Sequence, residues 1–436
     1  MSRLSVWKKP LLAAILLFSF SRLLYSVAVY NPVRTPSLSG DFQASYAEAA
    51  HWKQTGQFKL MAFTNVPYPP FFYWWIFPLT AVPYATLSAI LYAAQFLLFP
   101  WAFALLAKSA APDSRLRTAD LLACALLAIN FQPFLETLST HKVEGMELFL
   151  IALAIFAFKR GKDPLAGALI FLAAGLKYLP GILALYFLWK REWRAAAGFF
   201  TAGFLCWAAF AFSFGLHAAW DLGIRQTLWV GFHPEAESNR LMANFEWQSL
   251  SEVIHRLFAQ PVSWRLLGER LSAAQALAVS LPRSAALLEN LLKGILLAGF
   301  LFLTRRPYPR AQRASLWPLF LLEISLALLM MPVLLQAFRT HYGILLLPAV
   351  FFAGFLILAD WERGGAAEKI LFAAGYALSA TLVPGGLLNK LPAVSSFGGP
   401  YSRLYEWWSL PFYGYILLAA AVLILHKRFQ GALLKK

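Results

Sequence analysis

The sequence predicts an all-α integral membrane protein from its composition, its apolar run lengths and the position of its charges. Of the 436 residues, 60% are hydrophobic and only 14% are charged. So much apolar surface exceeds what a soluble core can bury, and lipid must therefore solvate much of the chain. The net charge of +17 lies in short basic clusters between apolar runs. This pattern is typical of cytoplasmic membrane loops and gives no reason to expect nucleic-acid binding.

Several apolar runs are long enough to cross a bilayer as a helix, which takes about 20 residues. They cover residues 10–30, 84–107, 195–214, 284–304, 315–335, 341–359, 368–386 and 409–426. The first resembles a signal peptide, but no small-residue cleavage pattern follows it, so we expect an uncleaved span. Two shorter runs, 119–133 and 143–158, are predicted to cross and return as a pair.

Residues 164–189 allow two interpretations. One long helix would put the basic clusters at 159–162 and 190–194 on opposite sides of the membrane. A hairpin that breaks near Lys177–Pro180 would put both clusters in the cytoplasm, which the positive-inside rule favours. The hairpin gives a single domain, residues 1–436, with about 12 transmembrane helices and short re-entrant pairs. Both termini are then cytoplasmic, and the expected location is the cell membrane.

Three long segments face the non-cytoplasmic side in this topology. They cover about residues 31–80, 215–282 and 387–408, and they are rich in Trp, Tyr, Pro and Gly. This composition suits the membrane interface and predicts interfacial helices there. The sequence contains no Walker-type loop, HExxH or nucleophile elbow, which removes the common ATP-driven, zinc and hydrolase signatures. We expect no metal and no cofactor.

Asp41 follows the first span and lies where a helix is predicted to begin, near Phe42, with Gly56 ending it. An N-cap alone would explain this acid. The functional alternative depends on its position in the first outer loop, at membrane depth, ahead of Tyr46 and the aromatic segment from Tyr68. A polar substrate carried on a lipid would arrive at this depth.

Four segments in order carry a family resemblance. Asp41 on its short helix precedes YPPFFYWWIFPL, and GALIFLAAGLKYLPGILALYFLWKREWRAA, EWQSLSEVIHRLF and RTHYGILLLP follow. Together they resemble glycosyltransferase family 87, a branch of the GT-C superfamily that depends on polyprenol-phosphate sugars. The resemblance reaches from Asp41 to about Pro348. It departs from the family at His141, Lys142 and Glu144, where many members show Gly-Gln and then Asn.

The resemblance implies a GT-C-type bundle that transfers a sugar with inversion by a single displacement. The donor would be a polyprenyl monophosphate sugar, with mannose as first choice, and the acceptor an envelope glycan or glycolipid on the non-cytoplasmic face. Asp41 would be the base. The implied partners are membrane lipids, the lipid-linked sugar and the acceptor.

Residue chemistry leads to the same site independently. Sugar transfer from a lipid phosphate needs a base, cations for the departing phosphate, and aromatic surfaces. Asp41 is the candidate base, with Glu144, Asp221 and Glu246 as competitors. The candidate substrate-binding residues are Lys177, His341, Arg339, Arg256, Tyr68, Tyr46, Gln248, Ser249, Lys142 and Glu144.

Lys177 is ionisable within an apolar run, so it needs a functional anion or a partner. A phosphate is one choice, and an ion pair with Glu136, Glu144 or Glu147 is the other. For each arginine candidate, interfacial anchoring is the structural alternative. Glu323 falls in the cytoplasmic half of a span, and we do not expect it in the site.

Two other functional classes stay open. A transporter of lipid-linked sugar or solute would also use buried Lys and Arg, but it needs a pathway that opens to both faces. The third class is an envelope polysaccharide polymerase or ligase.

Overall fold

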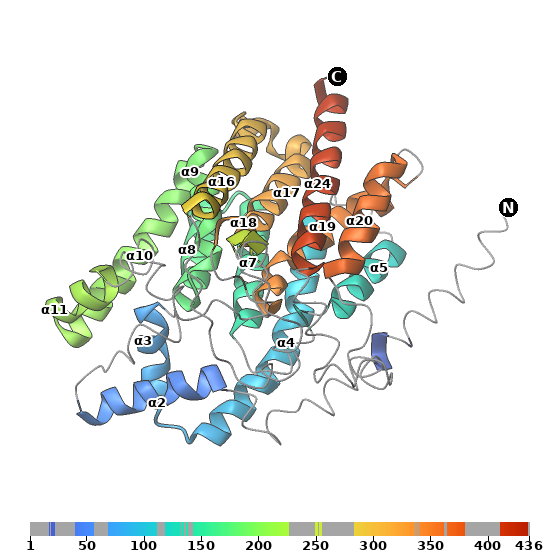
Figure 1. The fold of residues 1–436 in the computed structure, drawn as a ribbon. Coiled ribbons are helices and arrows are strands. Elements are labelled where there is room, and N and C mark those ends of the chain that lie inside the picture. The colour runs from blue at the N-terminus through green and yellow to red at the C-terminus, as the bar shows by residue number, and fades with distance from the viewer. Residues whose placement is uncertain are drawn as a thin grey trace.

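The computed structural model describes residues 17, 19–21, 40–55, 69–110, 118–131, 133–134, 137, 143–225, 249–251, 253–254, 283–335, 338, 340–361, 364–379 and 410–434. All secondary structure in these residues is helical, and no strand occurs among them (Figure 1). The all-α prediction is therefore confirmed for the described part of the chain.

The described helices vary widely in length. The α-helices are α2 (Gly40–Thr55), α3 (Pro70–Leu79), α4 (Tyr84–Ala110), α5 (Thr118–Asn130), α7 (Glu144–Lys159), α8 (Asp163–Leu176), α9 (Ile182–Trp189), α10 (Trp193–Phe214), α11 (Leu216–Ala218), α16 (Arg283–Thr304), α17 (Arg313–Leu329), α18 (Met331–Leu334), α19 (Leu347–Ala359), α20 (Ala366–Ser379) and α24 (Leu410–Leu434). Short 3-10 helices cover η2 (Leu179–Gly181), η4 (Arg310–Gln312) and η5 (Thr340–Leu346), and a π-helix covers η3 (Ala219–Arg225).

Six described helices are long and apolar enough to cross a membrane. They are Tyr84–Ala110, Trp193–Phe214, Ser284–Thr304, Arg310–Leu334, Tyr342–Ala359 and Leu410–Gly431. Each corresponds to one of the long apolar runs of the sequence. The run at 10–30 lies almost entirely outside the described residues, and the run at 368–386 is described as far as the end of α20. The protein is therefore a membrane protein with several spanning helices.

Several described basic residues at helix ends lie at one end of the bundle, which we call the basic end. There the Lys159 ammonium donates to the Lys108 carbonyl at 2.7 Å, which joins the ends of α4 and α7. Lys190 donates to the Thr304 carbonyl at 2.9 Å, which adds α9 and α16. Arg428 on α24 pairs with Glu368 on α20. Basic clusters distant in sequence thus share one end, as expected if their loops lie on one side of the membrane.

The chain reverses direction between α8 and α9. Arg313 pairs with Asp163 at the start of α8 and, at 2.9 Å, with Glu192 just after α9. A continuous helix of this length would separate those two acids by about 40 Å, so the segment forms a hairpin. Its tip is Lys177, whose backbone is extended and ends α8. Pro180, three residues later, lies at the start of a new helical segment, where proline is tolerated.

Small residues let this hairpin pack against α10. A Cβ added to Gly167 would clash with the Ala195 carbonyl, and one added to Gly198 would clash with the Pro164 carbonyl. The two backbones therefore touch directly, as is common where helices associate in lipid. This contact fixes α8 against α10 and so helps to hold Lys177 away from the basic end.

Candidate active site

Helix α2 lies across the end of the bundle opposite the basic end (Figure 1). We call this the site end; it comprises α2, α3, the start of α7 and the hairpin tip at Lys177. Ser45, Glu48 and Trp52 are buried on one face of α2, consistent with their spacing of three and four residues. Asp41 lies four residues before Ser45, in the first turn of α2 and in register with that face. The Asp41 side chain lies outside what the structure describes.

The aromatic segment after Tyr68 forms α3, which packs against α2. Helix α3 begins at Pro70, where the lost N–H costs no hydrogen bond. The Trp52 ring lies 5.2 Å from the Phe77 ring in an edge-on arrangement. Tyr46 donates its O–H to the Val82 carbonyl at 2.8 Å, so this predicted substrate residue ties α2 to the start of the next span.

Tyr73 connects α2 with the hairpin tip. Burial raises its pKa to about 12, and the nearby Glu48 carboxylate and Tyr178 phenol add to the rise, while a hydrogen bond with Ser45 opposes it. Tyr73 therefore keeps its proton at neutral pH. Because Tyr178 follows Lys177 directly, the buried face of α2 lies close to the tip of the hairpin.

Lys177 is buried, with 4% of its surface exposed, and the structure shows its partner. Its ammonium donates to Glu144 Oε1 at 2.7 Å and lies 3.9 Å from the centre of the Tyr342 ring. Of the two candidate partners that the structure describes, Glu144 and Glu147, Glu144 forms the ion pair; Glu136 lies outside the described residues. Both contacts stabilise a cation in this apolar setting. Tyr342 lies on η5, next to His341, of which the structure describes only the backbone.

Glu147 lies one helical turn after Glu144 and is fully buried. It interacts electrostatically with both Glu144 and Lys177. Neither of its carboxylate oxygens has a hydrogen-bond partner within the described part of the chain. The sequence singled Glu147 out only as a possible partner of Lys177. The sequence feature that marks Glu147 is its spacing of three residues from Glu144 at the start of an apolar helix, which puts both acids on one face.

One hydrophobic cluster joins the neighbourhoods of three candidate residues. Phe42, Val143 and Leu176 belong to it, and they are the chain neighbours of Asp41, Glu144 and Lys177. Phe72 and Ile76 of α3 complete the contact. The start of α2, the start of α7 and the hairpin tip therefore meet in one region.

This region lies in a chain whose residues 66–332 match the sequence profile of glycosyltransferase family 87. The match covers more than half of the chain. The protein belongs to glycosyltransferase family 87. It is therefore a glycosyltransferase, as the order of its motifs indicated. No functionally curated protein and no solved structure matches it.

The family 87 match includes Glu144 and Lys177 but ends before Arg339 and His341, and Asp41 lies ahead of it. Several predicted site residues of this family 87 chain lie outside the part that the structure describes: Tyr68, Lys142, Gln248, Arg256, Arg339 and the competing acid Glu246. Their roles stay predictions. The other competitor, Asp221, pairs with the exposed His217 at 3.1 Å.

Ser249 lies in a different part of this glycosyltransferase. It is fully buried, and Leu250 beside it packs against Ala285 of α16 and against Val333 and Phe412. This cluster is distinct from the one around Leu176. Across the described residues, no three His, Cys, Asp or Glu side chains come close enough to hold a metal ion.

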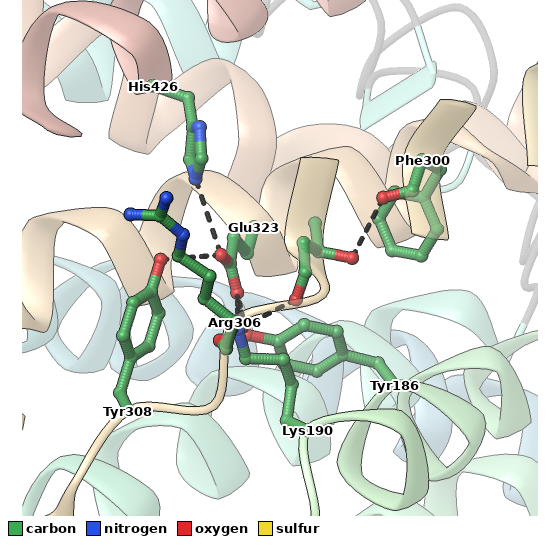
Figure 2. A network of polar contacts seen from close by, with 8 residues as sticks. Tyr186, Lys190, Phe300, Arg306, Tyr308, Glu323 and His426 are labelled. Atoms are coloured by element: carbon green, nitrogen blue, oxygen red, sulfur yellow. Dashed lines mark hydrogen bonds and ion pairs between the residues drawn. The ribbon is translucent and has the colours of Figure 1, made fainter. Parts of the chain in front are cut away.

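A second buried charge cluster of the family 87 protein surrounds Glu323 (Figure 2) and includes Lys190 of the basic end. Glu323 accepts hydrogen bonds from the Tyr186 and Tyr308 hydroxyls at 2.9 and 2.6 Å. It also pairs with Lys190 at 2.8 Å and contacts His426 Nε2 at 3.3 Å. Both carboxylate oxygens are thus occupied by groups from α9, α24 and the loop before α17. This network joins those segments, so its role is structural.

Proposed function

We propose that this glycosyltransferase moves a sugar, with mannose as first choice, from a polyprenyl monophosphate to an envelope glycan or glycolipid. The observation that carries the proposal is Lys177, a buried cation on a hairpin tip at the end opposite the basic clusters. An intramembrane cation at such a place suits an anionic substrate that arrives through the lipid. The proposed architecture is a GT-C-type bundle with about 12 crossings and re-entrant pairs, formed by a single domain.

The proposed sidedness follows from the basic end. If its loops face the cytoplasm, both chain termini lie there and the site end faces the other side of the membrane. Nucleotide sugars are confined to the cytosol, so a donor used at the site end is lipid-linked. A reporter fused at Lys436 tests this topology, and an extracytoplasmic signal there would overturn the sidedness.

In the proposed mechanism, Lys177 stabilises the charge that develops on the departing phosphate. Glu144 holds the ammonium in position in the absence of donor. Arg339, Arg256, His341 and Lys142 are proposed to complete the cationic surroundings of the phosphate. Bidentate and charge-assisted hydrogen bonds from such groups are the usual way to hold a phosphate.

Asp41 is the proposed base for the acceptor hydroxyl. Its place in the first turn of α2 supports this role, because the positive end of the helix dipole favours an ionised acid. An ionised carboxylate can accept the proton as the acceptor oxygen attacks the anomeric carbon and the phosphate leaves. Attack from the face opposite the phosphate gives inversion.

The decisive experiment compares wild type with Asp41→Asn. Purified proteins receive a labelled polyprenyl-phosphate mannose and membrane glycolipids, and transfer of the label is measured. Because a general base contributes typically 10²–10⁴-fold, we expect a loss of about 1,000-fold in rate. Asp221→Asn tests the competing acid and should transfer at the wild-type rate if Asp41 is the base. Transfer by Asp41→Asn at that rate would show that Asp41 is not the base.

A further inference from the structure

Glu147 differs from the other fully buried glutamates in having no hydrogen-bond partner for either oxygen within the described residues. Glu323 accepts from two tyrosines and pairs with Lys190. Glu368 pairs with Arg428. Folded proteins satisfy nearly all buried polar atoms, and each exception needs an explanation. For Glu147, the candidate explanations are a structural role or a ligand.

The contacts of Glu147 do not favour a structural role. It lies near Lys177, but the ammonium donates to Glu144 instead, at 2.7 Å. Glu147 therefore adds a second carboxylate beside an ion pair that is already formed. Two carboxylates close together repel each other, so the ligand-free site is destabilised by this arrangement. If this position served only the stability of the fold, an apolar side chain would stabilise it more than an unpaired buried carboxylate.

The chemistry of the donor indicates which ligand group fits. Both carboxyl oxygens of Glu147 are unpaired acceptors within the described residues, so they need hydrogen-bond donors. The isoprenoid chain has none, and the phosphate diester of the lipid-linked sugar offers only acceptor oxygens. The sugar hydroxyls are donors, and in a glycosyl phosphate they lie next to the phosphate. A donor whose phosphate is held at Lys177 would bring those hydroxyls to the neighbouring carboxylate.

We propose that Glu147 accepts hydrogen bonds from hydroxyls of the transferred sugar and thereby determines which sugar is used. The proposal rests on the proposed function, because it needs a phosphate at Lys177. It extends that function by assigning sugar recognition to α7, one turn from the Lys177–Glu144 pair. A site that hydrogen-bonds a substrate hydroxyl discriminates strongly against the analogue lacking it, since its own polar group is then left unpaired.

The test measures discrimination between hydroxylated and deoxygenated donors. Wild type, Glu147→Gln and Glu147→Leu receive polyprenyl-phosphate mannose and its 2-, 3-, 4- and 6-deoxy analogues. We expect wild type to prefer mannose over one of the analogues by about 10- to 100-fold in kcat/KM, as is typical of hydrogen bonds to charged groups. Glu147→Leu should lose this preference, and Glu147→Gln, which keeps one acceptor oxygen, should retain part of it.

Thermal unfolding without donor provides the second readout. Glu147→Leu should keep or raise the wild-type midpoint, because it removes a buried carboxylate that has no partner. Glu368→Leu is the matched control: the same substitution breaks the pair with Arg428, so its midpoint should fall while its sugar preference stays that of wild type.

The outcomes separate the two proposals. If Glu147→Leu keeps the wild-type preference, the inference is overturned and the proposed function stands. A lowered midpoint, with equal losses on mannose and on every analogue, also overturns it, since Glu147 would then be structural. If wild type transfers from no polyprenyl-phosphate sugar, the proposed function itself fails.

Discussion

The basic end and the site end of the bundle both bury glutamates in apolar surroundings, but the two sets of contacts differ. At the basic end, Glu323 is surrounded by donors from three parts of the chain (Figure 2). At the site end, Glu144 is paired with Lys177 while Glu147, one turn away, has no hydrogen bond within the described residues. The carboxylate with both oxygens occupied joins helices, whereas the one with neither occupied is the basis of the proposed contact with the sugar.

The basic end also shows what its charges stabilise. Arg313 joins the two ends of the α8–α9 hairpin through Asp163 and Glu192. Lys190, just after α9, reaches both Glu323 and the Thr304 carbonyl. These contacts fix the base of the hairpin, and the rigid helices α8 and α9 carry Lys177 to the other end. The ion pairs of Arg313 and Lys190 at the basic end thus help to position Lys177 at the site end.

The largest expected effect is on the stability of the basic end. Glu323→Leu leaves the Lys190 ammonium buried without its carboxylate and leaves two tyrosine hydroxyls without an acceptor. Breaking a buried pair in this way costs about 3–5 kcal/mol. We expect the thermal midpoint in detergent to fall sharply, because this loss is a large fraction of a typical stability of about 5–15 kcal/mol.

The double variant Lys190→Met/Glu323→Leu tests the reason for that loss. Replacing both partners by apolar residues of similar size is often neutral, because no charge is left buried alone. The double variant should therefore recover the part of the loss that comes from the unpaired ammonium, while the Tyr186 and Tyr308 hydroxyls still lack their acceptor. If it is as unstable as Glu323→Leu, shape rather than charge pairing determines the stability of this cluster.

The hairpin shows how far the sequence alone could go. Basic clusters at both ends of 164–189 and Pro180 within it predicted a break near Lys177–Pro180, and α8 ends at Leu176, directly before that stretch. The partner of Lys177 was not predictable, because three glutamates were equally available in the sequence. Spacing along the chain gives the depth and the face of a residue, but not which side chain from another helix meets it.

The same limit applies to both buried clusters. Composition and run length predicted the helices, and motif order predicted family 87, because both are properties of the chain itself. Glu147 was visible only as an acid near Lys177, and its lack of hydrogen bonds depends on the packing around α7. Arg313 was visible only as one cation in a basic loop. Its contact with both Asp163 and Glu192 depends on the reversal of the hairpin.

A smaller effect on stability, with a larger one on activity, is expected at the site end. Lys177→Met leaves Glu144 and Glu147 buried together without the ammonium. We expect a loss of about 3 kcal/mol, at the low end for a broken buried pair, because a carboxylate can take up a proton. Adding Glu144→Leu should restore the thermal midpoint but not sugar transfer. Recovery of transfer in the double variant would show that Lys177 serves only to neutralise Glu144.

The smallest expected effect is at Tyr73, where the pH dependence of stability tests the packing of the site end. Its pKa lies at about 12 in the folded protein and at 10.0 for an ordinary tyrosine. A group whose folded pKa is raised contributes stability that is present below pH 10 and lost as the pH rises towards 12. At neutral pH, Tyr73→Phe should cost only about 1 kcal/mol, for the hydrogen bond with Ser45.

Between pH 10 and 12, wild type should therefore lose more stability than Tyr73→Phe, which has no phenol to ionise at this position. Thermal midpoints of both proteins measured at intervals from pH 8 to about 12 follow this difference. Converging curves above pH 10 would support a partly buried Tyr73 beside Glu48. Parallel curves would mean that the phenol is exposed in solution, and α2 would then not be packed against α3 as described. Because Asp41 lies on α2, that result would also remove the support for placing the proposed base near the hairpin tip.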